Sequence, residues 1–325
     1  MKNSNTELYP IKFYPIYKQK IWGGNKLASN LGRPGAPKGN CGESWEVSTV
    51  PQNVSIIKGG RLGGLPLDKV IKSYQADLLG KKVYAEYGNT FPLLIKYIDA
   101  VDNLSIQVHP NDELALKRHS SLGKTEMWYI MEAEEGALII NGFNQKLRKD
   151  DYLTMLSNLG SIFKREEVKR GDAVFIPAGT VHAIGKGILL AEIQQCSDVT
   201  YRIYDYERAG DNGNKRELHL EDAFDAIDYR NENSYIKRYQ KHSIPKLVNC
   251  AYFTTNHVET EAEMLRDYSQ LDSFVIYMIM EGAALIKTES GETNMTRGDV
   301  CLIPACFDYS IIKPLTKSRF LEVHC

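Results

Sequence analysis

An eight-residue pattern that occurs twice constrains the fold of this chain more than any other feature. Residues 171–178 read GDAVFIPA, and residues 298–305 read GDVCLIPA. A similar apolar strand pair precedes each copy, YIMEAEEGALII from Tyr129 and YMIMEGAALI from Tyr277. Self-similarity of this kind is typical of a repeated supersecondary unit. We therefore expect two related β units, each a barrel or a sandwich.

The rest of the chain is also predicted to be mainly β, because its short apolar stretches have a period of two and are separated by Gly, Pro and Asn. Helical spacing is found in three stretches: Pro66–Leu79, Asp150–Phe163 and Leu218–Ile227. Gly80 is the predicted end of the first helix. The second stretch lies where the first copy of the repeat is longer than the second copy, so we predict a helical insertion there.

Two polar stretches, Ala209–Arg216 and Tyr229–Lys246, are predicted to be connectors. The second is a plausible domain boundary. We therefore predict a larger domain over residues 1–240 and a smaller one over residues 241–325.

Composition favours an ordinary globular protein. Of the 325 residues, 43% are hydrophobic and 25% charged, and the formal net charge is −1, which points to neither nucleic acid nor an anionic membrane as a partner. The first ten residues hold no apolar signal segment, and the longest apolar stretch, Phe274–Met280, is too short to span a bilayer. These features predict a cytoplasmic protein.

The six cysteines are scattered without CxxC pairs, which favours free thiols in a reducing compartment. Cys301 and Cys306 lie within an apolar strand pattern. We interpret them as core residues and not as zinc ligands.

The strand LSIQVHP, residues 104–110, carries polar groups in an unusual place. Alternation puts Leu104, Ile106 and Val108 on one face as packing residues. Ser105, Gln107 and His109 then share the other face. Burying such groups without partners costs about 1–3 kcal/mol each, so a metal or ligand is expected beside them.

Two further segments supply candidate ligands. In KTEMWYI, residues 124–130, Lys124, Glu126 and Trp128 share one face, and PAGTVHAI places His182 after a tight turn. Two imidazoles, one carboxylate and one amide oxygen suit Zn²⁺, although Fe²⁺, Mn²⁺ or Co²⁺ could occupy such a site. The set predicts one open, catalytic metal site per chain: Gln107, His109, Glu126 and His182.

The remaining histidines lie in polar or terminal stretches, where an ordinary surface position is the usual outcome. We expect no ligand role for any of them: His119, His219, His242, His257 and His324.

Several motifs together resemble a known family. The pattern G-x5-P-x-G-x2-H from Gly171 to His182 resembles the second cupin motif, and the Gln107–His109 strand followed by Glu126 resembles the first. The following segments in combination resemble class I mannose-6-phosphate isomerase in its short bacterial form: YKQKIWGG, GESWEVS, SIQVHPND, GKTEMWYI and SDVTYRIYDYER. The resemblance implies two cupin-like β-barrels (jelly rolls) with a few helical insertions, and conversion of mannose 6-phosphate to fructose 6-phosphate through an enediol.

The resemblance also implies Arg202 as the principal catalytic residue, steadying the enediolate or orienting the phosphate, because a guanidinium stays protonated and is a poor base. Lys124 shares a strand face with Glu126 and is a candidate for phosphate binding or proton transfer. Ser105 is a candidate phosphate partner. Glu192, on a face with Leu190 and Gln194, is a further candidate, either for acid–base chemistry or for a supporting position behind the ligands.

At a constant offset in the repeat, Gly179 corresponds to Cys306 and His182 to Tyr309. We therefore expect the second copy to bind no metal and to be structural. The sequence leaves open a non-catalytic sugar-binding cupin with a structural metal and, more weakly, a metal-dependent dioxygenase. It does not indicate the oligomeric state.

Overall fold

The structure is a computed structural model that describes residues 7–33, 35–151, 162–210, 213–230, 234–238 and 246–325. The chain forms two compact units. Residues 17–44 and 95–239 make up the first β unit, and residues 1–16, 45–94 and 240–325 make up the second β unit. The predicted domains, 1–240 and 241–325, therefore differ from these units by the two N-terminal segments that are grouped with the second unit.

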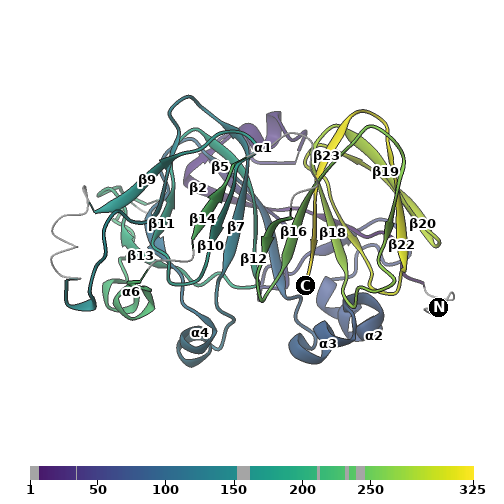
Figure 1. The fold of residues 1–325 in the computed structure, drawn as a ribbon, viewed down its shortest axis with the longest axis horizontal. Coiled ribbons are helices and arrows are strands. Elements are labelled where there is room, and N and C mark those ends of the chain that lie inside the picture. Colours follow the sequence, from purple (N-terminus) through teal and green to yellow (C-terminus); the bar gives the residue numbers. More distant parts are fainter. Residues whose placement is uncertain (1–6, 34, 152–161, 211–212, 231–233, 239–245) are drawn as a thin grey trace. The chain divides into compact units, whose positions relative to one another are not determined.

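The first β unit is built on two sheets (Figure 1). One sheet has seven strands in the order β14 (Tyr235–Lys237), β10 (Ala173–Ile176), β7 (Glu126–Ala133), β12 (Ile188–Gln195), β5 (Leu93–Ala100), β2 (Ile16–Gly24) and β3 (Cys41–Val47). The other has five, in the order β13 (Tyr201–Tyr204), β6 (Ile106–Val108), β11 (His182–Ile184), β8 (Leu138–Phe143) and β9 (Phe163–Glu167). Short helices complete the unit: α1 (Lys26–Ser29), α4 (Asp112–His119), the 3₁₀ turn Lys149–Asp151 and α6 (Leu220–Ala226).

The inner faces of the two sheets share one core. Trp128 and Leu190 from the seven-stranded sheet pack with Ile139 and Ile184 from the five-stranded sheet. On the outer face of the five-stranded sheet, a second core joins β6 to α6, with the members Ile106, Val108, Ala183, Ile203 and Ala223. Because Ile106 and Val108 point outward, the residue between them, Gln107, points to the space between the sheets.

The second β unit also contains two main sheets. Five strands form one of them: β15 (Lys246–Asn249), β16 (Thr254–Thr260), β23 (Ser318–His324), β18 (Val275–Glu281) and β21 (Val300–Ile303). Four form the other: β17 (Met264–Asp267), β22 (Tyr309–Pro314), β19 (Ala283–Thr288) and β20 (Gly291–Thr296). A strand pair and two helices precede them: β1 (Lys12–Tyr14), β4 (Ile56–Lys58), α2 (Leu67–Leu79) and α3 (Lys81–Tyr87).

The helix predictions had different outcomes. α2 and α6 confirm the first and third helical stretches. α2 ends at Gly80, whose φ of +93° disfavours other residues and whose added Cβ would lie 2.4 Å from the Asp272 carbonyl oxygen. Helix α3 was not predicted. The proposed insertion helix, Asp150–Phe163, lies mostly outside the described residues.

The connector Tyr229–Lys246 was predicted without a strand, and this is wrong at β14. This three-residue strand pairs antiparallel with β10. The first and last residues of this strand, Tyr235 and Lys237, are exposed. No apolar alternation therefore marks the strand in the sequence.

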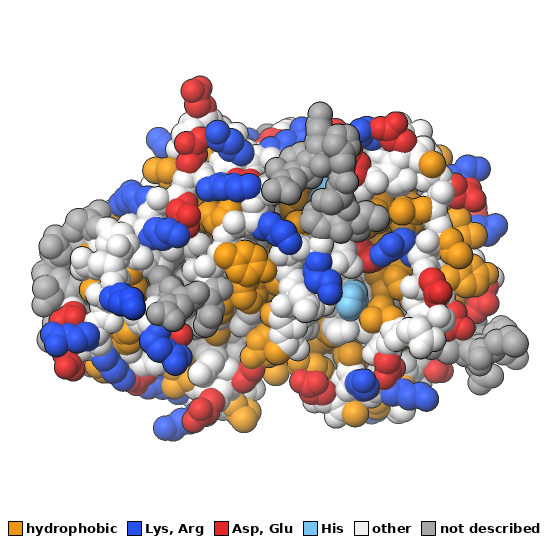
Figure 2. Space-filling model, in the orientation of Figure 1, with side chains coloured by type: hydrophobic (Ala, Val, Ile, Leu, Met, Phe, Trp, Pro, Cys, Tyr) orange, Lys and Arg blue, Asp and Glu red, His pale blue; other side chains and the backbone are white. Residues whose placement is uncertain are grey.

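None of the six cysteines forms a disulfide in the structure, and Cys301 and Cys306 are buried, as predicted. No helix in the described part of the chain has the length and apolar character needed to cross a membrane. Basic and acidic side chains are interspersed over the face shown in Figure 2, in keeping with the near-zero net charge.

Strand pairing confirms that the two β units are related. Val174 and Cys301 occupy the same position in the two copies of the eight-residue pattern. Val174 lies opposite Trp128, and Cys301 lies opposite Tyr277. Trp128 and Tyr277 are therefore equivalent.

The next strand extends the equivalence to a pair of buried carboxylates. Glu192 lies opposite Trp128, and Glu322 lies opposite Tyr277. Glu322 is 1% exposed. Arg266 Nη2 donates a hydrogen bond of 2.6 Å to it, and the Tyr268 hydroxyl donates one of 2.7 Å. The second unit thus holds a buried, fully paired carboxylate.

We expect Glu322→Gln to lower the free energy of unfolding at neutral pH by about 2 kcal/mol, because charge-assisted hydrogen bonds are lost. Burial opposes ionisation, but the bonds from Arg266 and Tyr268 hold the pKa of Glu322 below its ordinary value of 4.5. The stabilisation is therefore complete above that value and is lost as the pH falls through the pKa of the folded protein. Urea unfolding from pH 3 to 8 should show a shallower acid-side decline for the variant. Identical slopes for the two proteins would contradict this.

Candidate metal centre

Strand register brings three predicted site residues into one row across the five-stranded sheet. His182 of β11 lies directly opposite Gln107 of β6, and Gln107 lies opposite Arg202 of β13. Residues directly opposite each other on antiparallel strands point to the same face of the sheet. All three side chains therefore belong to the face between the sheets.

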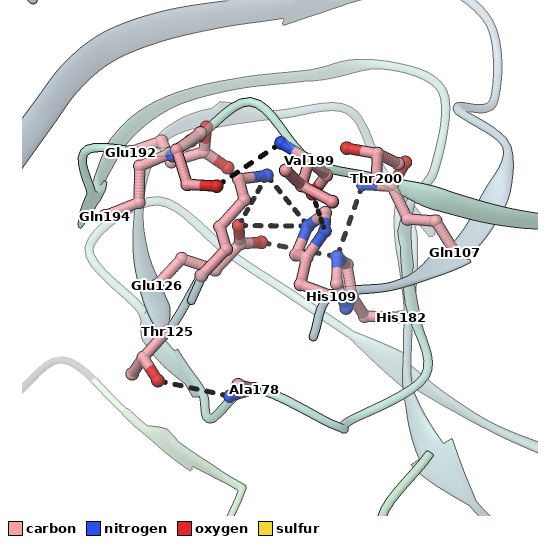
Figure 3. Close-up of polar contacts among 12 residues, drawn as sticks. Gln107, His109, Thr125, Glu126, Ala178, His182, Glu192, Gln194, Val199 and Thr200 are labelled. Carbon is pink, nitrogen blue, oxygen red and sulfur yellow. Dashed lines mark hydrogen bonds and ion pairs between the residues drawn. The ribbon is translucent and has the colours of Figure 1, made fainter. Parts of the chain in front are cut away.

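The facing sheet supplies the carboxylate. Glu126 begins β7, and its Oε2 lies 3.3 Å from His109 Nε2 while its Oε1 lies 3.3 Å from His182 Nε2 (Figure 3). One ligand atom from each of these three residues lies within 4.8 Å of the others. All three side chains are at most 1% exposed. The geometry of three of the four predicted ligands thus fits a shared cation.

Backbone carbonyls fix the state of both imidazoles. His109 Nδ1 lies 3.0 Å from the Val199 oxygen, and His182 Nδ1 lies 2.8 Å from the Thr180 oxygen. Because a carbonyl oxygen can only accept, each Nδ1 carries the proton and each Nε2 presents its lone pair toward Glu126. Burial and the charge of Lys124 lower the pKa of His109 to about 3, and burial also lowers that of His182. Both rings are neutral, as metal ligation requires.

The carboxyl group of Glu126 is ionised, which complements the two neutral imidazoles. Burial opposes its ionisation, but Lys124 and the two histidines hold its pKa well below the usual range. Neither carboxylate oxygen has a hydrogen-bond partner of regular geometry among the described residues. A buried anion that faces two imidazole lone pairs, with Lys124 as its cationic neighbour at 3.1 Å, is a chemical fit for a divalent cation.

The contacts of Gln107, the fourth predicted ligand, support a ligand role less directly. Its Nε2 lies 3.3 Å from His182 Nε2, and its Oε1 lies 3.5 Å from Ser105 Oγ. The nitrogen therefore faces His182 in this arrangement. Since the two ends of an amide have nearly the same shape, a half-turn of the group would present the oxygen as a ligand.

Lys124 lies inside the cluster. Its Nζ is 2.8 Å from His109 Nε2 and 3.1 Å from Glu126 Oε2, and the residue is 4% exposed. A lysine that is buried against the ligands has little access to a distant phosphate. Its position suits proton transfer better than phosphate binding.

Arg202 is partly buried on β13. Its Nη1 donates to the Glu217 carbonyl oxygen at 2.7 Å, while its Nε has no partner among the described residues. Burial and the neighbouring charge of Arg216 lower its pKa, although a guanidinium remains charged at neutral pH. The free Nε leaves it one donor for a ligand.

Glu192, predicted either as an acid–base residue or as a supporting residue behind the ligands, is engaged by two buried neighbours. Its Oε1 accepts a 2.9 Å hydrogen bond from Trp128 Nε1, and its Oε2 lies 3.0 Å from Lys96 Nζ. Lys96 is 6% exposed and was not singled out from the sequence. The lysine in the apolar strand LLIKYIDA is the signal that could have found it.

Two buried amides were also missed, and each lies directly opposite a predicted ligand. Asn141 of β8 faces His182, and Gln194 of β12 faces Glu126. Each has a buried amide oxygen without a partner among the described residues. Gln194 could have been found, because alternation from Glu192 places it on the inner face.

The histidine interpretation is wrong for His257, which is 2% exposed in β16. The strand around it, TTNHVET, is mostly polar, and this concealed a buried strand position. His119 is exposed and hydrogen-bonds the Tyr201 hydroxyl, while His242 lies outside the described residues.

Strand pairing identifies the counterparts of the ligands in the second β unit. Tyr309 lies opposite Asp267, as His182 lies opposite Gln107, so Asp267 corresponds to Gln107. Two residues before Tyr277, Val275 holds the position that Glu126 holds before Trp128. Valine cannot ligate a metal, which supports the prediction that the second unit has no such site.

Comparison with known proteins agrees with this geometry. The model of the phosphomannose isomerase type I catalytic domain matches residues 11–149, and that of the mannose-6-phosphate isomerase cupin domain matches residues 243–314. Mannose-6-phosphate isomerase of Streptococcus mutans is 35% identical over 291 residues, covering 88% of this chain and 89% of that protein. Mannose-6-phosphate isomerase ManA of Bacillus subtilis is 35% identical over 302 residues, covering 91% and 93%.

A solved structure of mannose 6-phosphate isomerase from Bacillus subtilis has a TM-score of 0.85 and 32% identity, and the match covers 98% of this chain and all of that one. The predicted cupin fold class and the family resemblance are both confirmed. The chain belongs to the type I phosphomannose isomerase, or mannose-6-phosphate isomerase, family.

Proposed function

We propose that this protein interconverts mannose 6-phosphate and fructose 6-phosphate through an enediol. The observation that carries the proposal is the convergence of two buried imidazoles on one buried carboxylate, Glu126, beside a buried lysine. A sugar-binding protein with a structural metal would give Lys124 no task at this position. The names of the relatives favour the enzyme as well.

One divalent cation, which we take to be Zn²⁺, would be held by His109, Glu126 and His182, with Gln107 as the fourth ligand. Imidazole nitrogens with a single carboxylate are a donor set that zinc accepts readily. When bound, the cation supplies Lewis acidity for the developing oxyanion of the sugar.

The protein's own groups carry the proton and place the substrate. The reaction moves one proton between C1 and C2, and Lys124 Nζ is the group beside the ligands that can hold it. Arg202, opposite Gln107 and with a free Nε, orients the phosphate or steadies the enediolate. Ser105, which is 4% exposed, would also contact the phosphate, through its hydroxyl. Glu192 acts on this site indirectly, by fixing Trp128 and Lys96.

We further propose that residues 1–240 fold as the catalytic domain and residues 241–325 as a structural domain, and that the enzyme works in the cytoplasm on a small sugar phosphate. A nucleic-acid or membrane partner has no support in the near-zero net charge.

A coupled assay for fructose 6-phosphate formation tests the function. The protein should turn over mannose 6-phosphate, lose activity on treatment with a chelator, and regain it when Zn²⁺ is added back. Full turnover by the metal-free protein would refute the role of the metal. A metal-loaded protein that leaves mannose 6-phosphate unchanged would refute the isomerase.

A further inference from the structure

Gln194 is a buried amide on the wall of the metal centre, and it has a fixed orientation. It is 0% exposed and lies directly opposite Glu126 across β12 and β7. Directly opposite residues on antiparallel strands have Cβ atoms about 5 Å apart and share a face. Figure 3 shows Gln194 with Glu192 on the side of the cluster away from Gln107.

The nitrogen end of this amide is fully used. Nε2 donates to the Gln195 carbonyl oxygen at 2.9 Å and to the Ser197 carbonyl oxygen at 2.6 Å. These bonds use both protons of the amide. A half-turn would set Oε1 against two carbonyl oxygens, so the amide is held in one orientation.

The oxygen end is left open. Gln194 Oε1 is buried and has no hydrogen-bond partner among the described residues. A buried acceptor in this state is unfavourable unless a donor arrives. The adjacent Gln195 differs: its Oε1 accepts from the Thr125 amide at 2.8 Å, and its Nε2 donates to Asp112 at 2.9 Å.

An amide oxygen can only accept a hydrogen bond, so the group that pairs with Gln194 Oε1 must be a hydrogen-bond donor. A phosphate dianion offers no proton, whereas a sugar hydroxyl does. Arg202 lies on the opposing sheet, across from Gln107, and is the better partner for the phosphate. Gln194 on one sheet therefore suits a hydroxyl of the sugar, and Arg202 on the facing sheet suits the phosphate.

Building on the proposed function, we infer that Gln194 Oε1 accepts a hydrogen bond from a ring hydroxyl of the bound sugar phosphate and thereby selects substrates that carry this hydroxyl. Gln194 is a binding and specificity residue. A site that hydrogen-bonds a hydroxyl discriminates strongly against the analogue that lacks it, because the buried acceptor is then left unpaired.

The test compares the wild type with Gln194→Met, which keeps the length of the side chain and removes the acceptor. Calorimetry would give the Kd of the zinc-loaded proteins for mannose 6-phosphate and for four analogues that lack the hydroxyl at C1, C2, C3 or C4. We expect one analogue to bind the wild type at least about tenfold more weakly than mannose 6-phosphate. For the variant this difference should disappear, with zinc content unchanged.

Gln195→Met is the matched control, since Gln195 lies on the opposite face of β12 with both ends of its amide paired. It should keep the wild-type pattern of discrimination. The four analogues also test the wild type alone, so the prediction stays testable even if the Gln194 variant folds poorly. If no analogue binds the wild type at least about tenfold more weakly than mannose 6-phosphate, the inference is overturned.

Equal affinities of Gln194→Met and the wild type for all five ligands would overturn the inference, and so would a uniform loss across them. Failure of the proposed function looks different. In that case the wild-type protein itself would not turn over mannose 6-phosphate.

Discussion

Glu126→Gln should remove the metal and the activity together. Glu126 is the only carboxylate in the described ligand cluster, and both of its oxygens face imidazole lone pairs. Replacing it by a neutral amide removes the one negative charge of the donor set. We expect metal affinity to fall by more than the roughly 10–100-fold typical of changes in the groups behind the ligands, and turnover to fall in proportion.

Elemental analysis of the purified variant and the coupled isomerase assay measure the two effects. Glu322→Gln is a matched control, because it makes the same change at the equivalent of Glu192 in the second β unit. That protein should be less stable but should keep a full complement of metal. A Glu126→Gln protein with wild-type metal content would show that the cluster is not the metal site.

Arg202→Ala should separate activity from metal binding. Arg202 lies opposite Gln107 and has a free Nε, but it offers no lone pair to a metal. Loss of a positioned charge that steadies a developing anion typically costs about 10²–10³-fold in turnover. We expect a kcat loss of this order with unchanged metal content.

Arg202→Lys should recover only part of the activity, because an ammonium lacks the planar fork of a guanidinium. Arg230→Ala serves as the control, since its side chain is 85% exposed and forms an ion pair with Asp228. Full activity of Arg202→Ala would remove Arg202 from the mechanism. Loss of metal in that variant would make its role structural.

The residues of the candidate metal centre could be predicted because each lies in or close to a short strand whose alternation is readable. Ser105, Gln107 and His109 alternate with apolar residues, and Lys124, Glu126 and Trp128 share one face of the next strand pattern. The repeat likewise predicted two related β units. These are local patterns, and one residue's neighbours in the chain are enough to show them.

The features that the sequence could not show depend on contacts between segments that are distant in the chain or on the path of the backbone. The Lys96–Glu192 pair joins β5 to β12, and no local pattern predicts that these strands belong to one sheet. The open oxygen of Gln194 depends on two backbone carbonyls that hold its nitrogen. Hydrogen bonds of this kind are set by the turn after β12 and leave no mark in composition or periodicity.

The equivalence of the two β units suggests a history of gene duplication followed by unequal loss. An ancestral module that carried metal ligands needs only a few inner substitutions to lose them, such as valine at position 275 and tyrosine at position 309. The Arg266–Glu322 ion pair then fills the interior with charges that satisfy each other. A copy without metal ligands is no longer bound by the side chains that ligation requires at its inner positions, and folding alone then limits which residues occupy them.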